Sequence, residues 1–333
     1  ESVVLRSFHA PFSIGSSELR VNCRIGIALA PADGDSADRL ISGAEAALKQ
    51  VSATGQRYQF CAPGMTERAT EKLALETKLR RAVELNQFVL HYQPKVDLKS
   101  GRVVGFEALV RWQDNDGRLI QPSTFVPMLE ETGLILDLGR WVLQRAAAQI
   151  GEWAERGIRS PPVAINVSAI ELGQPDFLRT LDDTLRRHPH ARGALDLEIT
   201  ESVLVDDLTT NIAKLKAVRE RGLSVAIDDF GTGYSSLGYL SRLPVDALKI
   251  DRSFVTRMGE DPHDMTIVMA IISLAHSMDL KVIAEGPETS AQAQLLRLLK
   301  CDQLQGFCFA QPLPPDEAVA LLEQRLQLDS LVP

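Results

Sequence analysis

The feature that most constrains this chain is an alternation of short apolar runs with longer amphipathic segments, which begins at Phe88. The runs are FVLHYQP, VVGFEALVRW, VAINVS, LDLEIT, LSVAIDD, DALKID, LKVIAEG and, more weakly, CDQLQGF. The amphipathic segments between most of them cover residues 138–156, 177–188, 211–221, 265–278 and 291–299. Strands that alternate with helices pair in parallel through crossover connections. About eight such units in roughly 240 residues predict an α/β fold, a closed (β/α)8 barrel, with an open doubly wound sheet as the alternative.

The first two runs depart from this pattern, because only the six residues DLKSGR (97–102) join them. A parallel pair needs a crossover of about a dozen residues or more, whereas an antiparallel pair needs only a short turn. We therefore expect a hairpin at this point. The predicted fold is a modified (β/α)8, TIM-like barrel with one antiparallel strand.

The N-terminal sixty residues predict a separate, smaller unit. The segment RVNCRIGIAL (20–29) is typical of a strand, residues 36–50 have apolar side chains at helical spacing, and residues 58–60 favour a second strand. Residues 67–84 are charged and helical, which indicates a connecting helix. Such a short segment forms a poor independent core, so we interpret it as part of an α/β domain. The chain starts without Met, and an upstream anchor or sensor region is compatible with it.

Charge and composition exclude several classes of function. The 36 Lys and Arg residues against 44 Asp and Glu residues give a net charge of −8, which offers no basic surface to a nucleic-acid polymer. No apolar run approaches the roughly 20 residues that span a bilayer, and no signal peptide is recognisable. The four cysteines form no CxxC pair or zinc-like set. We expect a soluble, cytoplasmic chain with reduced cysteines and no membrane contact of its own.

Most apolar runs contain or end at a polar residue from a limited set. They are Glu107, Asn166, Glu198, Asp228 with Asp229, Lys249, Glu285 and Gln305. Any one alone fits a solvated strand end, but in a barrel these positions meet at the C-terminal mouth, where active sites form. Oxygen ligands without clustered His or Cys favour Mg²⁺ or Mn²⁺ over zinc.

The adjacent Asp228 and Asp229 are typical of a site for two metal ions, because one carboxylate can bridge both ions. Two ions about 3.5–4 Å apart clamp the attacking and leaving oxygens of a phosphodiester and activate the attacking water. This pattern predicts a hydrolase. Lys249 either orients that water and offsets phosphate charge or forms a structural ion pair under the barrel mouth, and both interpretations remain open at this stage.

Other polar motifs are less informative. The GTGYSS turn (231–236) lacks the spacing of a nucleotide P-loop, and we interpret it as a loop that positions the aspartates. The six histidines show no metal-binding spacing. Ser168, Ser202 and Ser235 lack a GxSxG context, which disfavours serine-hydrolase chemistry.

The region from Phe88 to about Leu322 resembles the EAL-domain cyclic-di-GMP phosphodiesterases. The EAL tripeptide is residues 107–109, within GFEALVRW. It is accompanied, in order, by YQP, NVS, LEITES, IDDFGTGYSSL, LKIDRSFV, AEGPET and CDQLQGF. The resemblance implies a modified barrel that hydrolyses one phosphodiester of cyclic-di-GMP to give linear pGpG with Mg²⁺ or Mn²⁺, two ions per site.

The resemblance also implies roles for individual residues. Glu107, Asn166, Glu198 and Asp228 would hold the first metal ion, and Asp228, Asp229 and Glu285 the second. Lys249 and Gln305 would position the water, and Glu285 is also a possible general base. Glu201 would brace the loop after Asp229. Gln93, Leu109, Arg111 and Glu288 would lie against the substrate.

The first sixty residues resemble the C-terminal half of a GGDEF diguanylate-cyclase domain, through CRIGIALAPADGD and AEAALKQVSATGQRYQF. The GG(D/E)EF signature is absent from this chain, so we expect no cyclase activity from it. We predict four regions: a partial GGDEF-like segment at 1–62, a connecting helix at 63–86, the EAL barrel at 87–325 and a tail at 326–333. The segment after GTGYSS resembles the family's dimer-forming region, which implies a homodimer through the EAL domain.

Three departures from the family pattern concern loops. Pro287 stands where Val is usual, RWQDNDG lacks the common His-Pro, and GFCFAQPL differs from the usual last-strand sequence. A proline fixes φ and removes an N–H donor, here between Glu285 and Glu288. Two other functions stay open at this stage, a non-catalytic cyclic-di-GMP receptor that acts through protein partners and a structural dimerisation module.

Overall fold

The structure is a computed structural model, and it describes residues 7–8, 10, 12–15, 17–54, 57–62, 64–201, 208–232 and 240–326. The chain divides into two compact units, Glu1–Leu79 and Arg80–Pro333. The second unit contains the predicted barrel and is the larger one. Among the described residues, no helix is both long enough and apolar enough to cross a membrane.

The first unit is a small α/β arrangement. Strands β1 (Phe12–Ile14) and β2 (Ser17–Leu19) form an antiparallel pair, and β3 (Ile25–Ile27) and β4 (Tyr58–Phe60) form a parallel pair. Helix α2 (Ala37–Thr54) packs on β3 and β4. Helix α3 (Met65–Glu84) begins in this unit and continues past its boundary.

The expected strand at residues 20–29 is wrong in its length. Only Ile25–Ile27 forms a strand there, because its partner β4 is three residues long and offers hydrogen bonds to three residues only. Packing on the helix explains a glycine within this strand. A Cβ added at Gly26 would lie 1.9 Å from the carbonyl oxygen of Ala44 in α2, so only glycine allows this close approach.

The second unit is a closed barrel, and the alternative of an open sheet is wrong. The strands are β5 (Phe88–Asp97), β6 (Val103–Gln113), β8 (Val163–Val167), β9 (Leu195–Thr200), β10 (Val225–Phe230), β11 (Ala247–Ile250), β12 (Lys281–Glu285) and β13 (Gln303–Gln305). They pair in the order β5-β13-β12-β11-β10-β9-β8-β6, and a further β5–β6 pairing closes the ring.

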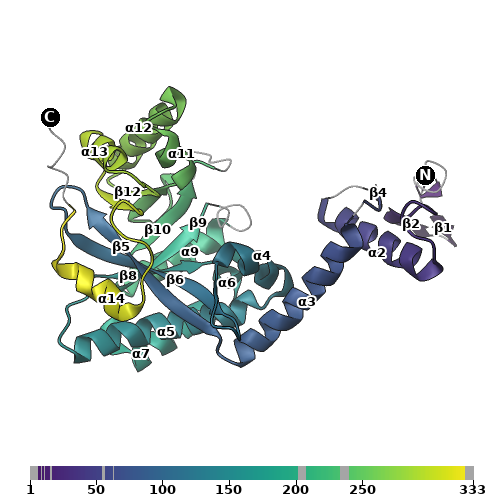
Figure 1. Ribbon diagram of the computed structural model, residues 1–333, viewed down its shortest axis with the longest axis horizontal. Helices are drawn as coiled ribbons and strands as arrows, with labels where there is room; N and C mark the ends of the chain where they lie inside the picture. The colour runs from purple at the N-terminus through teal and green to yellow at the C-terminus, as the bar shows by residue number, and fades with distance from the viewer. Residues whose placement is uncertain are drawn as a thin grey trace. The chain divides into compact units, whose positions relative to one another are not determined.

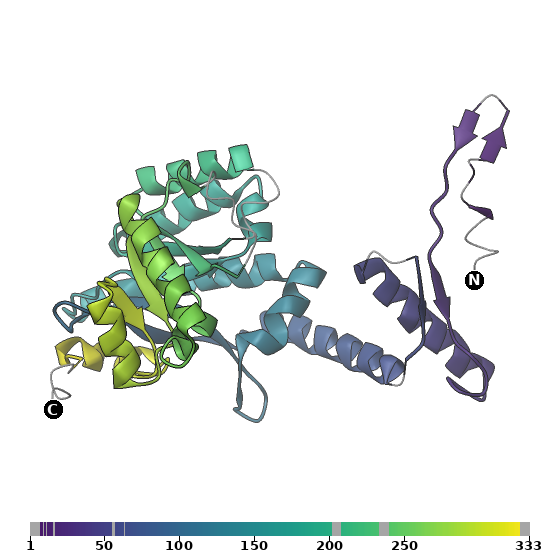
Figure 2. The same ribbon diagram turned by 90° about the horizontal axis from the view of Figure 1, so that it is seen from above.

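Strand β5 is the antiparallel member that the short DLKSGR connection predicts. It runs antiparallel to both of its neighbours, β6 and β13, whereas the other neighbouring pairs of the ring are parallel. The C-terminal elements and the β5–β6 hairpin consequently lie side by side, as both views show in yellow and blue (Figures 1 and 2). A two-residue strand, β7 (Leu119–Ile120), extends β6 antiparallel and was not predicted.

Helices cover the outside of the barrel (Figure 1). They are α4 (Pro122–Thr132), α5 (Ile135–Glu155), α6 (Ala169–Gly173), α7 (Phe177–Arg187), α9 (Leu208–Glu220), α11 (Arg252–Arg257), α12 (Pro262–Ser277), α13 (Ser290–Leu298) and α14 (Pro315–Ala320), with 3₁₀ turns η1 (Pro189–Ala191) and η2 (Leu321–Glu323). The five predicted helices are confirmed as α5, α7, α9, α12 and α13. The sequence pattern missed α4, α6, α11 and α14, because three of these are too short to establish a period and prolines interrupt α4.

Aromatic packing attaches the hairpin to helix α5. The Trp153 ring, fully buried on α5, contacts Tyr92 of β5 at a centroid distance of 5.0 Å and Phe106 of β6 at 5.9 Å. Tyr92 and Phe106 are also fully buried. They point outward to the helix, so their neighbours Gln93 and Glu107 point into the barrel. The hairpin therefore carries polar side chains into the barrel interior.

Cys23, Cys61, Cys301 and Cys308 are all described, and none of them forms a disulfide, as the sequence predicts. Burial raises the pKa of Cys301 to about 12 and that of Cys308 to about 11. Both thiols therefore stay protonated near neutral pH and act as small apolar side chains.

Two glycines in helix α5 predict opposite responses to the same substitution. A Cβ at Gly151 would meet no atom within 4 Å, so Gly151→Ala should stabilise the barrel by about 0.5–1 kcal/mol through helix propensity. A Cβ at Gly139 would lie 1.6 Å from Oε1 of Glu171, whose carboxylate completes the capping box of α6 with Ser168. Gly139→Ala should therefore lower the melting temperature in circular dichroism. Equal stabilisation by both substitutions would contradict the Gly139–Glu171 packing.

Candidate active site

The polar residues that the sequence singled out converge inside the mouth of the barrel, around one lysine. Lys249 on β11 has an exposed fraction of 0%. Its Nζ lies 2.5 Å from Oε2 of Glu198, 2.6 Å from Oε1 of Glu285, 3.0 Å from Oδ1 of Asp228 and 3.5 Å from Oε2 of Glu107. Four strands that are distant in sequence thus place carboxylates around a single ammonium group.

Amide side chains hold the Glu107 carboxylate on both sides. Nδ2 of Asn166 donates to its Oε1 at 2.5 Å, and Nε2 of Gln305 donates to its Oε2 at 2.5 Å. Nε2 of Gln305 also donates to Oε1 of Gln93 at 3.0 Å, and Nε2 of Gln93 donates to the carbonyl of Ala310. The first and last strands of the barrel therefore share one hydrogen-bond network.

The carboxylates form two overlapping groups of three. Glu107, Glu198 and Asp228 make one group, and Asp228, Asp229 and Glu285 make the other, each with ligand atoms within 4.8 Å of one another. Asp228 belongs to both groups. Oxygen-only donors at this separation fit hard divalent cations, so the buried acidic cluster is consistent with a divalent metal site.

Local backbone geometry separates the two adjacent aspartates. The pairing of β10 with β11 shifts register between Ile227 and Phe230, and Asp229 has a φ of +53°. Asp tolerates this left-handed conformation better than most residues. The backbone N–H of Asp229 donates to Oδ1 of Asp228 at 3.0 Å. The irregularity directs both carboxylates to the mouth, although neighbouring residues of a regular strand point to opposite faces.

The charges of the cluster shift the pKa of its members in different directions. Burial and neighbouring Asp228 raise the pKa of Glu285 to about 8, and they raise that of Asp229 to about 6. Burial opposes ionisation of Glu198 as well, but the two lysines beside it outweigh burial and lower its pKa to about 2. Burial lowers the pKa of Lys249, and the surrounding carboxylates raise it well above its usual value. Lys249 and Glu198 therefore stay charged at neutral pH.

A cleft of about 260 Å³ opens over the carboxylates. The four predicted substrate contacts Gln93, Leu109, Arg111 and Glu288 all line it, together with Glu107, Asp228, Glu285 and Gln305. The sequence reasoning missed six other lining residues, Arg252, Thr256, Gly286, Gly306, Phe307 and Pro312. Phe307 is half exposed, and the sequence signal for it is its place two residues after Gln305, the last residue of β13.

The unusual Pro287 packs between the two loops that border this cleft. Its carbonyl accepts a hydrogen bond from the N–H of Cys308 at 3.0 Å, and a Cβ at Gly306 would lie 2.3 Å from that carbonyl oxygen. The N–H of Glu288 donates to Oε1 of Gln292 at 2.7 Å. The proline thus contacts the loop after β13, and its missing N–H leaves these bonds intact.

Some predicted elements lie outside the described residues. These are Ser202, Ser235 and most of the GTGYSS loop, with residues 237–239 that follow it. Glu201 is described, and its Oε2 is buried without a hydrogen-bond partner among the described residues. Its predicted bracing of the loop stays a prediction. Ser168 caps helix α6, accepting from the N–H of Glu171 at 3.2 Å, which gives it a structural role.

One charged residue of the site was missed entirely. Lys95 on β5 is buried, and its Nζ forms a very short ion pair with Oε1 of Glu198. It follows Gln93 by two residues, so the period of a strand places both side chains on the same, inner face. That period was the available signal, because Lys95 follows the run FVLHYQP directly and still lies within β5, which ends at Asp97.

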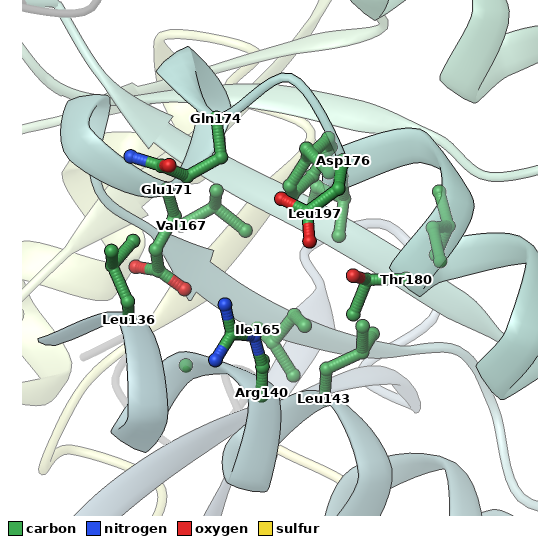
Figure 3. Close-up of a pocket in the computed structure, with 13 residues that line it drawn as sticks. Leu136, Arg140, Leu143, Ile165, Val167, Glu171, Gln174, Asp176, Thr180 and Leu197 are labelled. Atoms are coloured by element: carbon green, nitrogen blue, oxygen red, sulfur yellow. The ribbon is translucent and has the colours of Figure 1, made fainter.

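Two other cavities lie between the barrel strands and the helices that pack on them. An apolar one of about 570 Å³ lies between β6, β8 and helices α4, α5 and α6, and Asn166 lies on its lining. A smaller one of about 40 Å³ lies among β8, β9, α5 and α7, where the Arg140 and Glu171 side chains point toward one another (Figure 3). None of the predicted metal ligands lines this smaller cavity.

A closed barrel with carboxylates gathered at its mouth has the architecture of a metal-dependent barrel enzyme. The chain belongs to the EAL domain family, whose profile matches residues 76–312. It is 40% identical over 318 residues to the bifunctional diguanylate cyclase/cyclic di-GMP phosphodiesterase MucR of Pseudomonas aeruginosa, covering 95% of this chain and 46% of that relative. It is 39% identical over 315 residues to the cyclic di-GMP phosphodiesterase PdeR of Escherichia coli, covering 94% and 47%.

Solved structures agree with this family membership. A MucR phosphodiesterase in complex with c-di-GMP matches with a TM-score of 0.71 at 42% identity, covering 74% of this chain and 99% of that one. The EAL domain of Mycobacterium smegmatis DcpA matches with a TM-score of 0.60 at 38% identity, covering 72% and 97%. The chain spans about half the length of the two curated relatives.

The raised pKa values of Glu285 and Asp229 predict how stability depends on pH. The folded, metal-free site holds protons up to about pH 8 and about pH 6, whereas an unfolded carboxyl loses its proton near pH 4. Since the folded state binds more protons in this window, stability should fall as pH rises from about 5 to about 8. Melting temperatures in EDTA should show this fall, and Glu285→Gln should flatten it. A melting temperature that rises over this window in EDTA would contradict the assignment.

Proposed function

We propose that this chain hydrolyses cyclic-di-GMP to linear pGpG with Mg²⁺ or Mn²⁺, two ions per site. The observation that carries the proposal is the pair of overlapping carboxylate groups that share Asp228 under the cleft. Relatives that span nearly the whole of this chain are named cyclic di-GMP phosphodiesterases, which supports the same substrate. We infer that Glu107, Asn166, Glu198 and Asp228 hold the first ion and that Asp228, Asp229 and Glu285 hold the second.

The chain's own residues have separate roles in this proposal. Bound divalent ions supply positive charge for the phosphate and lower the pKa of the attacking water. Gln305 donates through Nε2 to Glu107 and Gln93, while its buried Oε1 has no hydrogen-bond partner among the described residues. We infer that this Oε1 and Lys249 position the water, with Glu285 as a possible base. The water oxygen bonds to phosphorus, and one ribose oxygen leaves and takes up a proton.

The cleft supports the assignment of the substrate contacts. Arg111 is buried, and its Nη1 donates to the carbonyl of Val110 at 2.8 Å, which restrains the guanidinium at the cleft wall. A restrained guanidinium offers its remaining N–H groups to a phosphate. We infer that Arg111 contacts phosphate and that Gln93, Leu109 and Glu288 contact the rest of the dinucleotide.

We also propose that residues 1–62 are the C-terminal part of a GGDEF-like domain. In this proposal residues 63–86 are a connecting helix, residues 87–325 are the EAL barrel and residues 326–333 are a tail. The small parallel pair β3–β4 and helix α2 are compatible with such a fragment. The alignment with a bifunctional diguanylate cyclase/phosphodiesterase, which covers 95% of this chain, supports it. Glu201 is proposed to brace the loop after Asp229.

The third element of the proposal is a homodimer through the EAL domain. Its support is the resemblance of the segment after GTGYSS to the dimer-forming region of the family. Light scattering coupled to size-exclusion chromatography should give about twice the chain mass of 36.6 kDa. A monomeric mass at micromolar concentration would contradict this part of the proposal and leave the hydrolytic site unaffected.

Glu107→Gln tests the catalytic proposal, because it keeps the side-chain shape and removes one ligand charge. Turnover of cyclic-di-GMP with Mg²⁺ or Mn²⁺, followed as pGpG by chromatography, should fall at least about a hundredfold, because changes to the outer partners of metal ligands already cost about 10–100-fold in metal affinity or activity. Glu323→Gln, at an exposed glutamate of η2, is the matched control and should keep full activity. Tight binding by the unaltered chain without hydrolysis under either metal would favour the receptor function instead.

A further inference from the structure

We propose that Lys95 is a positioning residue for the metal site and that it acts through Glu198. Its ammonium bonds Oε1 of the Glu198 carboxylate from below the mouth of the barrel. This inference deepens the proposed function and rests on Glu198 being a metal ligand. Lys95 does not line the substrate cleft. It is therefore not a catalytic residue in the sense of touching the reacting atoms.

The contact geometry shows that Glu198 is held at both oxygens. Nζ of Lys95 bonds Oε1, and Nζ of Lys249 lies 2.5 Å from Oε2. Glu198 is 1% exposed and Lys95 is 7% exposed, so water competes little for either group. A carboxylate turns readily about its last torsion unless both oxygens are engaged. The two lysines together therefore fix the plane of the Glu198 carboxylate and leave Oε2 on the side of the other ligands.

The barrel has an unusual interior that lets a lysine reach this position. Bulky aliphatic side chains usually fill such interiors. Beneath the mouth, this barrel has Gly105, Ala164, Ala226 and Ala247 on the lining of a cavity of about 570 Å³. Gly105 lies directly opposite Lys95 in the hairpin, and a Cβ there would lie 3.5 Å from Cδ of Lys95. These small side chains give the Lys95 stem room to extend to Glu198.

Asp196, another acidic residue on the lining of that cavity, is already engaged. Asp196 precedes Glu198 by two residues on β9 and accepts the N–H of Ser224 at 3.0 Å. Its carboxylate lies near enough to Lys95 for a charge interaction, but the described hydrogen bond of the Lys95 ammonium goes to Glu198. The Lys95 ammonium is thus directed to Glu198 in the active site and not only to Asp196, two residues earlier on β9.

The positions of the two lysines on either side of Glu198 support the same assignment. Lys249 lies among Glu107, Glu198, Asp228 and Glu285, on the side of the other ligands. Lys95 adds a second buried cation on the outer side of Glu198. Partners that hold a metal ligand from its outer side commonly affect metal affinity by about 10–100-fold, because they fix the orientation of that ligand.

The test measures Mn²⁺ binding without any dinucleotide, by the loss of the free-ion signal in electron paramagnetic resonance. Lys95→Met should weaken Mn²⁺ binding by about 10–100-fold. Lys95→Arg, which keeps the charge and the donors, should recover most of it. Lys281→Met removes the same charge from the lining of the same cavity and should leave Mn²⁺ binding unchanged. Unchanged binding in folded Lys95→Met would overturn the proposal, as would an equal loss in Lys281→Met.

A double-mutant cycle with Glu198→Gln keeps the proposal testable if Lys95→Met fails to fold. The variant with both Lys95→Met and Glu198→Gln removes both charges of the buried pair, so neither residue leaves the other's charge unpaired. If Lys95 acts through Glu198, its substitution should change Mn²⁺ binding less than threefold in the Glu198→Gln background. A further tenfold loss there would overturn the proposal. Hydrolysis is assayed separately, so Mn²⁺ binding that depends on Lys95 without pGpG formation would refute the proposed function alone.

Discussion

The buried ammonium of Lys249 is the interaction on which the rest of the active-site structure depends. A lysine with no exposed surface is expensive unless its charge is compensated, and here four carboxylates from β6, β9, β10 and β12 compensate it. The carboxylates in turn would repel one another without the lysine. The neighbours β10 and β12 of β11, and also β9 and β6 from further round the ring, must therefore be in register before either charge is tolerated. The site and the closure of the barrel depend on each other.

Reversal of β5 determines which side chains join this cluster. Because β5 runs antiparallel to both neighbours, Gln93 lies opposite Glu107 in the hairpin. Oε1 of Gln93 accepts a hydrogen bond from Gln305 of the last strand, which also donates to Glu107. The same inner face of β5 brings Lys95 to Glu198. Strand β5 thus links β6 to the last strand, β13, and closes the ring. It contributes Gln93 at the level of the cleft and Lys95 beneath the cleft.

The loops at the mouth show how a departure from the family pattern is accommodated. Pro287 packs against Gly306, which has no room for a Cβ, and its carbonyl accepts the N–H of Cys308. The loops after β12 and β13 therefore contact each other through backbone atoms, next to Glu288 and Phe307 of the cleft. The substitution affects the wall of the cleft, and the carboxylates below it stay in place.

The sequence by itself determined the fold class, the antiparallel hairpin and the chemical type of the site. Period-2 and helical patterns are local properties, and a limited set of acidic and amide residues recurs at the strand ends. Short helices such as α6 were missed because one turn does not establish a period. Only the tertiary structure decided that Lys249 lies at the centre of four carboxylates, that Asp228 belongs to both groups and that Lys95 reaches Glu198. These relations depend on the register of the barrel, which brings together strands that are far apart in the chain. They depend also on the space left by Gly105 and three alanines. A local sequence pattern does not encode contacts between residues so far apart in the chain.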